Sequence, residues 1–166
     1  MRFTLCLALA AASSALATTP AQLMNQLTVV TTDANKLNTS LAVANLTYSS
    51  AYAIHSLALT TIKDINNGTS LCNTTTGFTA ANGISVIQTV VNNLTPPTLA
   101  ALTSLINKKS QFDSFKLGSI AKTDITNLHT AVDNLSACIV SAVQNATVTP
   151  LDTGFNQAAA AYASES

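Results

Sequence analysis

Few side chains in this sequence could carry catalytic chemistry. The two histidines, His55 and His129, lie on different predicted helices, and neither has metal-ligand spacing to its neighbours. Glu165 is the single glutamate, so a mechanism that uses paired glutamates is excluded. The chain has neither a G-x-S-x-G nucleophile elbow nor a glycine-rich phosphate loop. We therefore expect no catalytic residue, no metal and no cofactor.

A histidine on an apolar helix face is the first candidate for ligand binding. His55 lies about 40° from the centre of the apolar stripe of its predicted helix. One interpretation is a histidine at the edge of the core that hydrogen-bonds a backbone carbonyl or a hydroxyl. The other interpretation joins His55 with Tyr48, Tyr52 and Ser56 in the polar end of an apolar pocket.

A second polar cluster is "LINKKSQFDSF" at residues 105–115, in a chain with only 8% charged and 5% aromatic residues. Lys108 and Lys109 fall in the last turn of a predicted helix, where cations meet the negative end of the helix dipole. Asp113 or Ser114 could cap the next helix. The cluster is thus either a structural joint between two helices or a pocket mouth at which the lysines meet a fatty carboxylate.

Helices must position these groups, because apolar residues recur at alternating spacings of four and three along most of the chain. Strand patterns are absent. The sequence therefore predicts an all-α fold, a helical bundle of about five helices with short connections. The predicted helices cover approximately residues 23–44, 48–65, 79–94, 99–109 and 117–142.

The predicted boundaries rest on weak helix formers, glycine and proline. Residues 45–50 favour a break between the first two helices. Asn67-Gly68 predicts the end of the second helix, so that residues 69–77 form a loop carrying Cys72. Pro96-Pro97 is expected to stop the third helix and start the fourth.

The start of the chain is typical of a targeting segment. Residues 1–17 combine a positive charge, the apolar run "LCLALAAA" and a small-x-small cleavage site, so we expect a signal peptide. Residues 18–149 form the bundle, and residues 150–166 form a polar linker followed by a tail that is either a short helix or frayed. No later apolar run approaches the ~20 residues of a membrane span. We expect a secreted, extracellular protein, free or in the cell wall.

The charge of the chain excludes nucleic-acid partners. Removal of the signal peptide would leave six lysines, no arginine and seven acidic residues, a net charge of −1. Such a chain lacks the basic surface that nucleic acid requires.

Asparagine sequons suggest that the surface carries sugar. Seven N-x-S/T sites occur, and the one at Asn93 is handicapped by a proline directly after it. The remaining glycosylation candidates are Asn38, Asn45, Asn67, Asn73, Asn134 and Asn145.

Two cysteines remain after loss of the signal peptide. In an oxidising compartment, Cys72 and Cys138 are expected to form a disulfide, with two free buried thiols as the alternative. Closing so long a loop would stabilise the fold by about 4 kcal/mol.

The apolar helix faces consist of Ala, Val, Leu and Ile. Such faces can form a tightly packed core of small side chains. They can also leave the middle of the bundle under-filled, so that it accepts an alkyl chain. Each buried CH₂ group would then contribute about 0.8 kcal/mol.

The stretch from "ALTSLINKKSQFDSF" through "KLGSIAKTDITNLHTAVDNL" resembles the fungal hydrophobic surface-binding protein A family, which includes secreted cell-wall galactomannoproteins. The similarity spans residues 21–144 and is most specific in its C-terminal third. The matching positions are Lys108, Lys109, Phe112, Asp113, Leu117, Gly118, Leu128, Val132 and Leu135.

The resemblance implies an all-helical secreted domain that adsorbs to hydrophobic surfaces. It also implies an apolar tunnel for fatty acids in the galactomannoprotein branch, recruitment of a secreted esterase to the surface, and no catalytic residue. The cysteine pair departs from the family pattern. We expect a secreted, non-catalytic protein that binds fatty-acid-like lipids or hydrophobic surfaces. A structural cell-wall glycoprotein without a lipid ligand is the alternative, and a small secreted hydrolase is the third interpretation.

Overall fold

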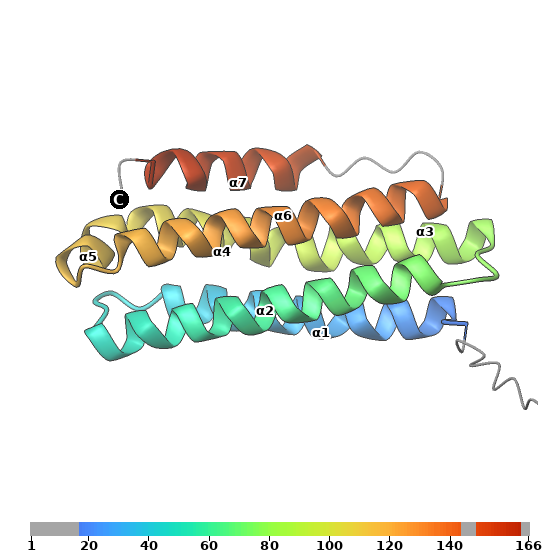
Figure 1. Cartoon of the computed structure of the whole chain (residues 1–166), viewed down its shortest axis with the longest axis horizontal. Helices are drawn as coiled ribbons and strands as arrows, with labels where there is room; N and C mark the ends of the chain where they lie inside the picture. Colours follow the sequence, from blue (N-terminus) through green and yellow to red (C-terminus); the bar gives the residue numbers. More distant parts are fainter. Residues whose placement is uncertain (1–16, 144–148, 164–166) are drawn as a thin grey trace, which may run out of the picture.

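The protein is an elongated bundle of helices, as the sequence predicted (Figure 1). The computed structural model describes residues 17–143 and 149–163, apart from the side chains of residues 143 and 149–152. The predicted signal peptide therefore lies almost wholly outside the described residues. The elements are α1 (Pro20–Leu41), α2 (Tyr48–Thr74), α3 (Ala80–Gln88), the π-helix η1 (Thr89–Leu94), α4 (Thr95–Asn107), α5 (Lys109–Ser114), α6 (Gly118–Val143) and α7 (Thr149–Ala161).

The predicted break between the first two helices is confirmed, and capping explains its position. Thr19 and Gln22 form a capping box at the start of α1, where Pro20 occupies a position that needs no N–H donor. Thr47 and Ser50 form a second capping box at the start of α2. Thr47 Oγ1 accepts from the Ser50 amide and Ser50 Oγ accepts from the Thr47 amide, so two amides at the start of α2 are satisfied without earlier carbonyls.

The predicted end of α2 at Asn67-Gly68 is wrong, because α2 continues to Thr74. Gly68 is buried, and a Cβ atom there would lie 3.5 Å from Leu135 Cδ1 on α6. The glycine lets the two helices approach each other, so packing outweighs its low helix propensity. Cys72 consequently belongs to the last turns of a helix and not to a loop.

Pro96-Pro97 does not separate two helices either, since α3, η1 and α4 form one continuous helical run. The π-helix ends at Leu94, one residue short of the two prolines, and the intervening Thr95 donates from its backbone N–H and from its hydroxyl to the Val90 carbonyl. Thr98 Oγ1 donates to the Leu94 carbonyl at 2.8 Å. Hydroxyl donors and wider π turns thus accommodate the two missing proline N–H groups.

The turn into α6 also differs from the prediction. Asp113 and Ser114 lie within α5, so neither caps α6. The turn closes at Lys116, which has a φ of 59°, and the Leu117 amide donates back to the Phe112 carbonyl at 2.9 Å. This left-handed residue ends α5 in the way that a glycine usually does.

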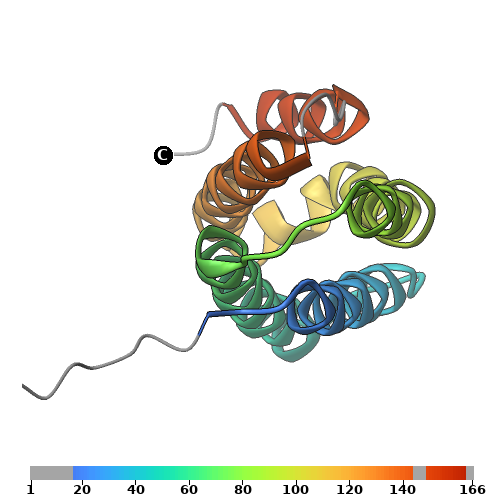
Figure 2. The same ribbon diagram turned by 90° about the vertical axis from the view of Figure 1, so that its right-hand side faces the viewer.

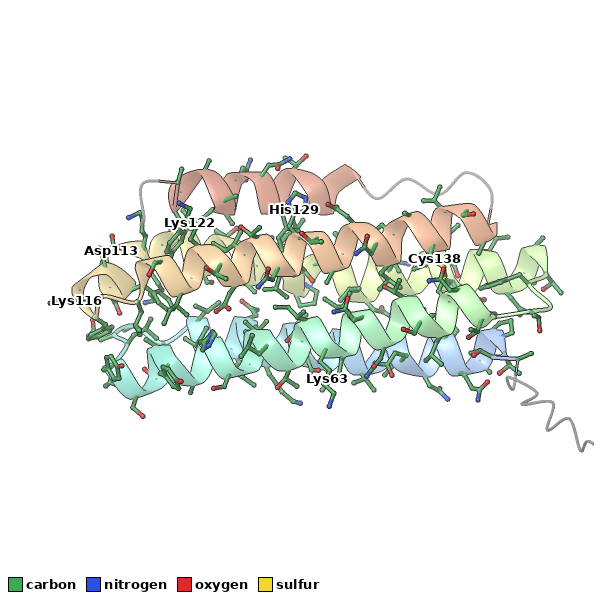
Figure 3. All side chains as sticks on the ribbon, in the orientation of Figure 1. Lys63, Asp113, Lys116, Lys122, His129 and Cys138 are labelled. Carbon is green, nitrogen blue, oxygen red and sulfur yellow. A yellow bond between two sulfur atoms is a disulfide. The ribbon has the colours of Figure 1, made fainter. Side chains whose placement is uncertain are left out.

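The predicted disulfide is confirmed. Cys72 and Cys138 are joined with Cα atoms 6.2 Å apart, which links the end of α2 to the C-terminal part of α6 (Figure 3). The bridge adds a covalent tie to two long helices that already pack against each other.

The C-terminal segment forms a helix that belongs to the bundle. Figure 2 shows α7 on top of α6 and beside the α3–α4 run, and α7 packs on both α4 and α6. Phe155 and Tyr162 are fully buried, and Tyr162 donates its hydroxyl proton to the Leu105 carbonyl at 2.9 Å. Gly154 lies inside α7, so close to α4 that a Cβ atom would come within 2.5 Å of Leu99 Cδ2. The predicted polar linker bounded by Pro150 and Gly154 is therefore wrong.

Helix packing closes the bundle into a ring. The neighbouring pairs with extensive contact are α1 with α2, α2 with α6, α6 with α7, α7 with α4, and α4 with α1. The short helix α7 is thus the main connection between α4 and α6. None of the helices in the described part of the chain is both long and apolar enough to cross a membrane.

Candidate functional site

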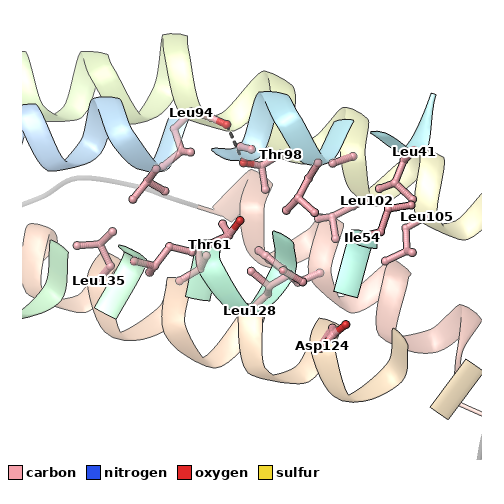
Figure 4. A pocket seen from close by; sticks show the side chains of 18 of the residues that line it. Leu41, Ile54, Thr61, Leu94, Thr98, Leu102, Leu105, Asp124, Leu128 and Leu135 are labelled. Atoms are coloured by element: carbon pink, nitrogen blue, oxygen red, sulfur yellow. Dashed lines mark hydrogen bonds between the residues drawn. The ribbon is translucent and has the colours of Figure 1, made fainter. Parts of the chain in front are cut away.

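A partly enclosed apolar cavity of about 80 Å³ lies inside the ring of helices (Figure 4). Every described helix except α3 contributes to its wall. Along α6 the wall extends from Ala121 to Ile139, which corresponds to roughly 27 Å of helix. The residues that line the cavity are therefore spread along the bundle axis.

Small side chains leave this space empty. The wall is built mainly from leucine, isoleucine and valine, but alanine occupies one position on each of the four long walls. These positions are Ala34 on α1, Ala58 on α2, Ala101 on α4 and Ala121 on α6. Because each alanine contributes a single methyl group where its neighbours contribute branched chains, the ring can close without filling its interior.

Three hydroxyl groups interrupt the apolar wall. Thr61 Oγ1 donates to the Leu57 carbonyl and Thr98 Oγ1 to the Leu94 carbonyl, both at 2.8 Å. Ser136 is also buried in the wall. The two threonine hydroxyls are satisfied within their own helices, so they cost little in an apolar interior.

The wall also contains one carboxylate, Asp124 of α6, at the end of the cavity near Ile54 and Leu105 (Figure 4). His55 of α2 holds it, with Nδ1 2.8 Å from Asp124 Oδ2 and 3.0 Å from Oδ1. Burial raises the pKa of the Asp124 carboxyl above its ordinary value, while the hydrogen bond from His55 and its charge act in the opposite direction.

The predicted partner of His55 was a backbone carbonyl or a hydroxyl, and the structure shows a carboxylate. Tyr48, Tyr52 and Ser56, which were predicted to form the polar end of the pocket together with His55, do not belong to the cavity wall. Tyr48 and Tyr52 are 57% and 49% exposed, with their rings stacked 6.5 Å apart, and Tyr52 meets His55 edge to face at 5.6 Å. Ser56 is exposed. The structure thus brings the two tyrosines to the outer side of His55, and their contact with a ligand stays a prediction.

The two lysines are engaged in the joint between helices. Lys108 Nζ donates to the Ala44 carbonyl at 2.7 Å, which ties the α4–α5 turn to the α1–α2 connection. Lys109 Nζ lies 2.7 Å from Asp113 Oδ2 and 5.6 Å from the centre of the Tyr162 ring. Neither lysine belongs to the cavity wall. Their role toward a ligand headgroup also stays a prediction.

Sequence reasoning found the apolar wall but missed its polar and C-terminal members. The stripe predicted for α6 includes Leu128, Val132 and Ile139, all of which line the cavity. Asp124 was missed because it precedes a stripe residue and looks like a surface acid. Phe155 was missed, although its spacing of seven residues from Tyr162 indicates one helix face.

The described residues contain no group of three or more histidine, cysteine, aspartate or glutamate side chains that could hold a metal ion. The arrangement offers an apolar channel with a buried polar group at one end, which suits an amphiphilic chain better than a charged or planar ligand.

Comparison with known proteins assigns the chain to a family. The family model described as hydrophobic surface binding protein A matches residues 20–141, well over half of the chain. The chain belongs to this family. The match ends before α7, so the helix that closes the ring lies outside the matched segment of this hydrophobic surface binding protein A member.

Solved structures with the same fold include proteins crystallised with fatty acids. The structure of AfMP4p in complex with palmitic acid has 25% identity and a TM-score of 0.78, with 86% of this chain and 99% of that chain covered. Ligand-binding domain 2 of the Penicillium marneffei MP1 protein, complexed with multiple arachidonic acids, has 15% identity and a TM-score of 0.72. The match covers 87% of this chain and 94% of that chain. Ligand-binding domain 1 of MP1, complexed with arachidonic acids, has 15% identity and a TM-score of 0.71. The match covers 86% of this chain and 95% of that chain. The search of curated proteins found no match.

Proposed function

We propose that this protein binds fatty acids or similar single-chain lipids inside its helical ring and catalyses no reaction. The observation that carries the proposal is the partly enclosed apolar cavity, whose wall extends roughly 27 Å along α6. The palmitic acid complex of AfMP4p supports the proposal, because that protein has the same fold and 25% identity over nearly its whole length.

The size of the cavity implies that the ring widens when lipid enters. Pockets for drug-sized ligands typically measure ~300–1,000 Å³, whereas the cavity here measures about 80 Å³. Burial of each CH₂ group contributes about 0.8 kcal/mol to binding. The free energy needed to separate the helices offsets part of the total contribution of the chain. Affinity should therefore rise steeply with chain length once the ring is open.

A chain-length series tests the proposal directly. Two further CH₂ groups contribute about 1.6 kcal/mol, so each step from C12 to C14 to C16 should tighten binding by about 15-fold. Displacement of a fluorescent fatty acid measures the three constants. Mass spectrometry of protein extracted without detergent should show bound lipid, which a purely structural glycoprotein would lack. Equal affinity for the three acids, together with lipid-free native protein, contradicts the proposal.

The lysine contribution can be separated from cavity binding. Lys108 and Lys109 are bonded away from the cavity, so their replacement by glutamine should change palmitate affinity by less than about twofold. A loss of tenfold or more would support the alternative that a lysine meets the ligand carboxylate at the mouth.

The His55–Asp124 pair has the form of two members of a catalytic triad, which calls for a nucleophile bonded to the His55 ring. Within the described residues, no serine, threonine or cysteine hydrogen-bonds to the His55 ring. We therefore infer a binding role. Hydrolysis of a simple p-nitrophenyl ester that disappears in the H55Q variant would restore the hydrolase interpretation.

Adsorption to hydrophobic surfaces is the second candidate function, and the family description favours it. The large apolar side chains that are exposed are spread over α1, α2, α3, η1 and the α1–α2 connection. Strong adsorption would then require the ring to open and present its interior. The Cys72–Cys138 bridge resists such opening, so reduction should increase retention on octyl-coated beads. In this mode the adsorbed protein could recruit a secreted esterase, which a pull-down on coated beads would detect.

Secretion and glycosylation complete the proposal. Among the six glycosylation candidates, Asn45, Asn67, Asn73 and Asn134 lie exposed on the described surface, whereas Asn38 is half-buried and Asn145 lies outside the described residues. Exposed acceptor sites, the predicted signal peptide and a disulfide all suit an extracellular or cell-wall protein. Enzymatic removal of N-glycans from the secreted protein should increase its mobility on a denaturing gel.

A further inference from the structure

The cavity contains a charge that an ordinary fatty-acid site would avoid. Asp124 is 7% exposed, and it is the ionisable member of a wall that otherwise consists of apolar side chains and three hydroxyls. No lysine, arginine or histidine belongs to the wall. An ionised fatty carboxylate that entered this end would therefore meet the like charge of Asp124, and the wall itself supplies no cation, because His55 bonds Asp124 from outside the wall.

The geometry of the His55 contact leaves Asp124 able to accept a second hydrogen bond. A single donor atom, His55 Nδ1, lies within 3.0 Å of both carboxylate oxygens. An ionised carboxylate offers about four lone-pair positions, so acceptor capacity remains. Since Asp124 lines the cavity while His55 approaches it from α2, the remaining capacity is available to a group inside the cavity.

We propose that Asp124 is the headgroup anchor of the cavity, where it accepts a hydrogen bond from an uncharged lipid headgroup and disfavours an ionised one. The favoured headgroups are a protonated carboxyl and a hydroxyl. His55 is a positioning residue that orients the Asp124 carboxylate from outside the cavity. This inference rests on the proposed binding of single-chain lipids, and it adds that fatty acids load in acid and are released as the pH rises.

Among the described side chains, His55 is the charged group that shifts the pKa of Asp124. From α2, Asp124 faces His55, and α3 carries no titratable side chain. The nearest ions on α5, Lys109 and Asp113, pair with each other. On α7, the described titratable group is Tyr162, whose hydroxyl donates to a backbone carbonyl.

Burial and His55 set the direction of the Asp124 pKa. Burial raises this pKa above the ordinary value of 3.8, and His55 moderates the rise. The carboxyl is consequently protonated to a higher pH than an exposed aspartate, and it gains its charge as the pH rises through this raised pKa. The carboxyl of a bound fatty acid also loses its proton as the pH rises. The repulsion between the two carboxylates therefore grows because both groups become charged.

The test compares palmitic acid with hexadecanol, which has the same chain length and no charge at any pH. Both lipids are delivered from cyclodextrin, and dissociation constants are measured from pH 4.5 to pH 8 for the wild type and for D124N. In D124N the amide removes the negative charge and keeps an oxygen that can accept from His55. The matched control is D133N, because Asp133 is exposed on the same helix.

At pH 8 we expect the ratio of the palmitate to the hexadecanol dissociation constant to fall by at least about tenfold in D124N and to stay unchanged in D133N. H55Q is a second variant in case D124N folds poorly. It removes a charge that lowers the Asp124 pKa, so the pH at which palmitate binding weakens relative to hexadecanol should move upward.

Two results overturn the inference in different ways. If D124N and H55Q both keep the wild-type ratio at every pH and still bind hexadecanol, Asp124 is not the anchor. If the wild type binds neither lipid at any pH, the proposed function fails, and the anchor fails with it.

Discussion

The empty space beside Ala58 provides a sharp test of where the lipid binds. Ala58 lies on α2, is 3% exposed and belongs to the cavity wall. The A58L substitution adds three carbon atoms that point into this space. If they occupy the void without strain, the native state gains stability, because an empty volume of about 80 Å³ costs up to about 2 kcal/mol at ~24 cal/mol per Å³.

The same three carbon atoms compete with the ligand. They displace roughly three CH₂ groups of the lipid, each worth about 0.8 kcal/mol, so palmitate binding should weaken by about 2.4 kcal/mol or roughly 50-fold. The variant is therefore expected to be more stable and to bind lipid less tightly, a combination that general damage to the fold cannot produce.

Denaturant unfolding and displacement of a fluorescent fatty acid measure the two quantities. The control is A53L, because Ala53 is exposed on the same helix and undergoes the same change in helix propensity. It should leave both stability and affinity near the wild type. Wild-type palmitate affinity in a folded A58L protein would refute the placement of the lipid. A loss of stability beyond 2 kcal/mol would show that no usable space adjoins Ala58.

Four further predictions concern stability and ring closure. Replacing Cys72 and Cys138 with serine should lower the free energy of unfolding by about 4 kcal/mol, measured in denaturant, because the bridge closes a loop over 66 residues. K116G should raise it by about 1 kcal/mol, because the left-handed backbone at Lys116 favours glycine. The raised Asp124 pKa stabilises the fold fully below pH 3.8, and this contribution is lost as the pH rises through the folded-state pKa, so the wild type should lose stability relative to D124N over that interval. Truncation after Val143 removes α7 and should increase binding of an apolar dye and weaken palmitate binding.

The helical architecture could be predicted because it depends on local patterns that repeat along the chain. The stripe through Leu128 and Val132 specified the inner face of α6, and the same face lines the cavity. The Cys72–Cys138 pair followed from the number of cysteines. Both inferences need only residue spacing or residue number.

The errors occurred where tertiary contact outweighs local preference. Gly68 would end an isolated helix, yet the close approach of α6 makes its missing side chain an advantage. Pro96-Pro97 would interrupt a regular α-helix, yet threonine hydroxyls and a π-helix bridge the position. Asp124 has the sequence context of a surface acid, and only the approach of α2 places it beside a cavity. Sequence spacing on one helix carries no information about the partner that covers it.

Two contacts between helices of the ring differ in how they are held together. The disulfide fastens α2 to α6, whereas α4 and α6 meet chiefly through α7, a helix of 13 residues tethered at one end to α6. We therefore expect the ring to open first where α7 packs on α4 and α6 when its interior widens, because the disulfide holds α2 and α6 together. Lipid could then enter and leave while the rest of the bundle stays folded.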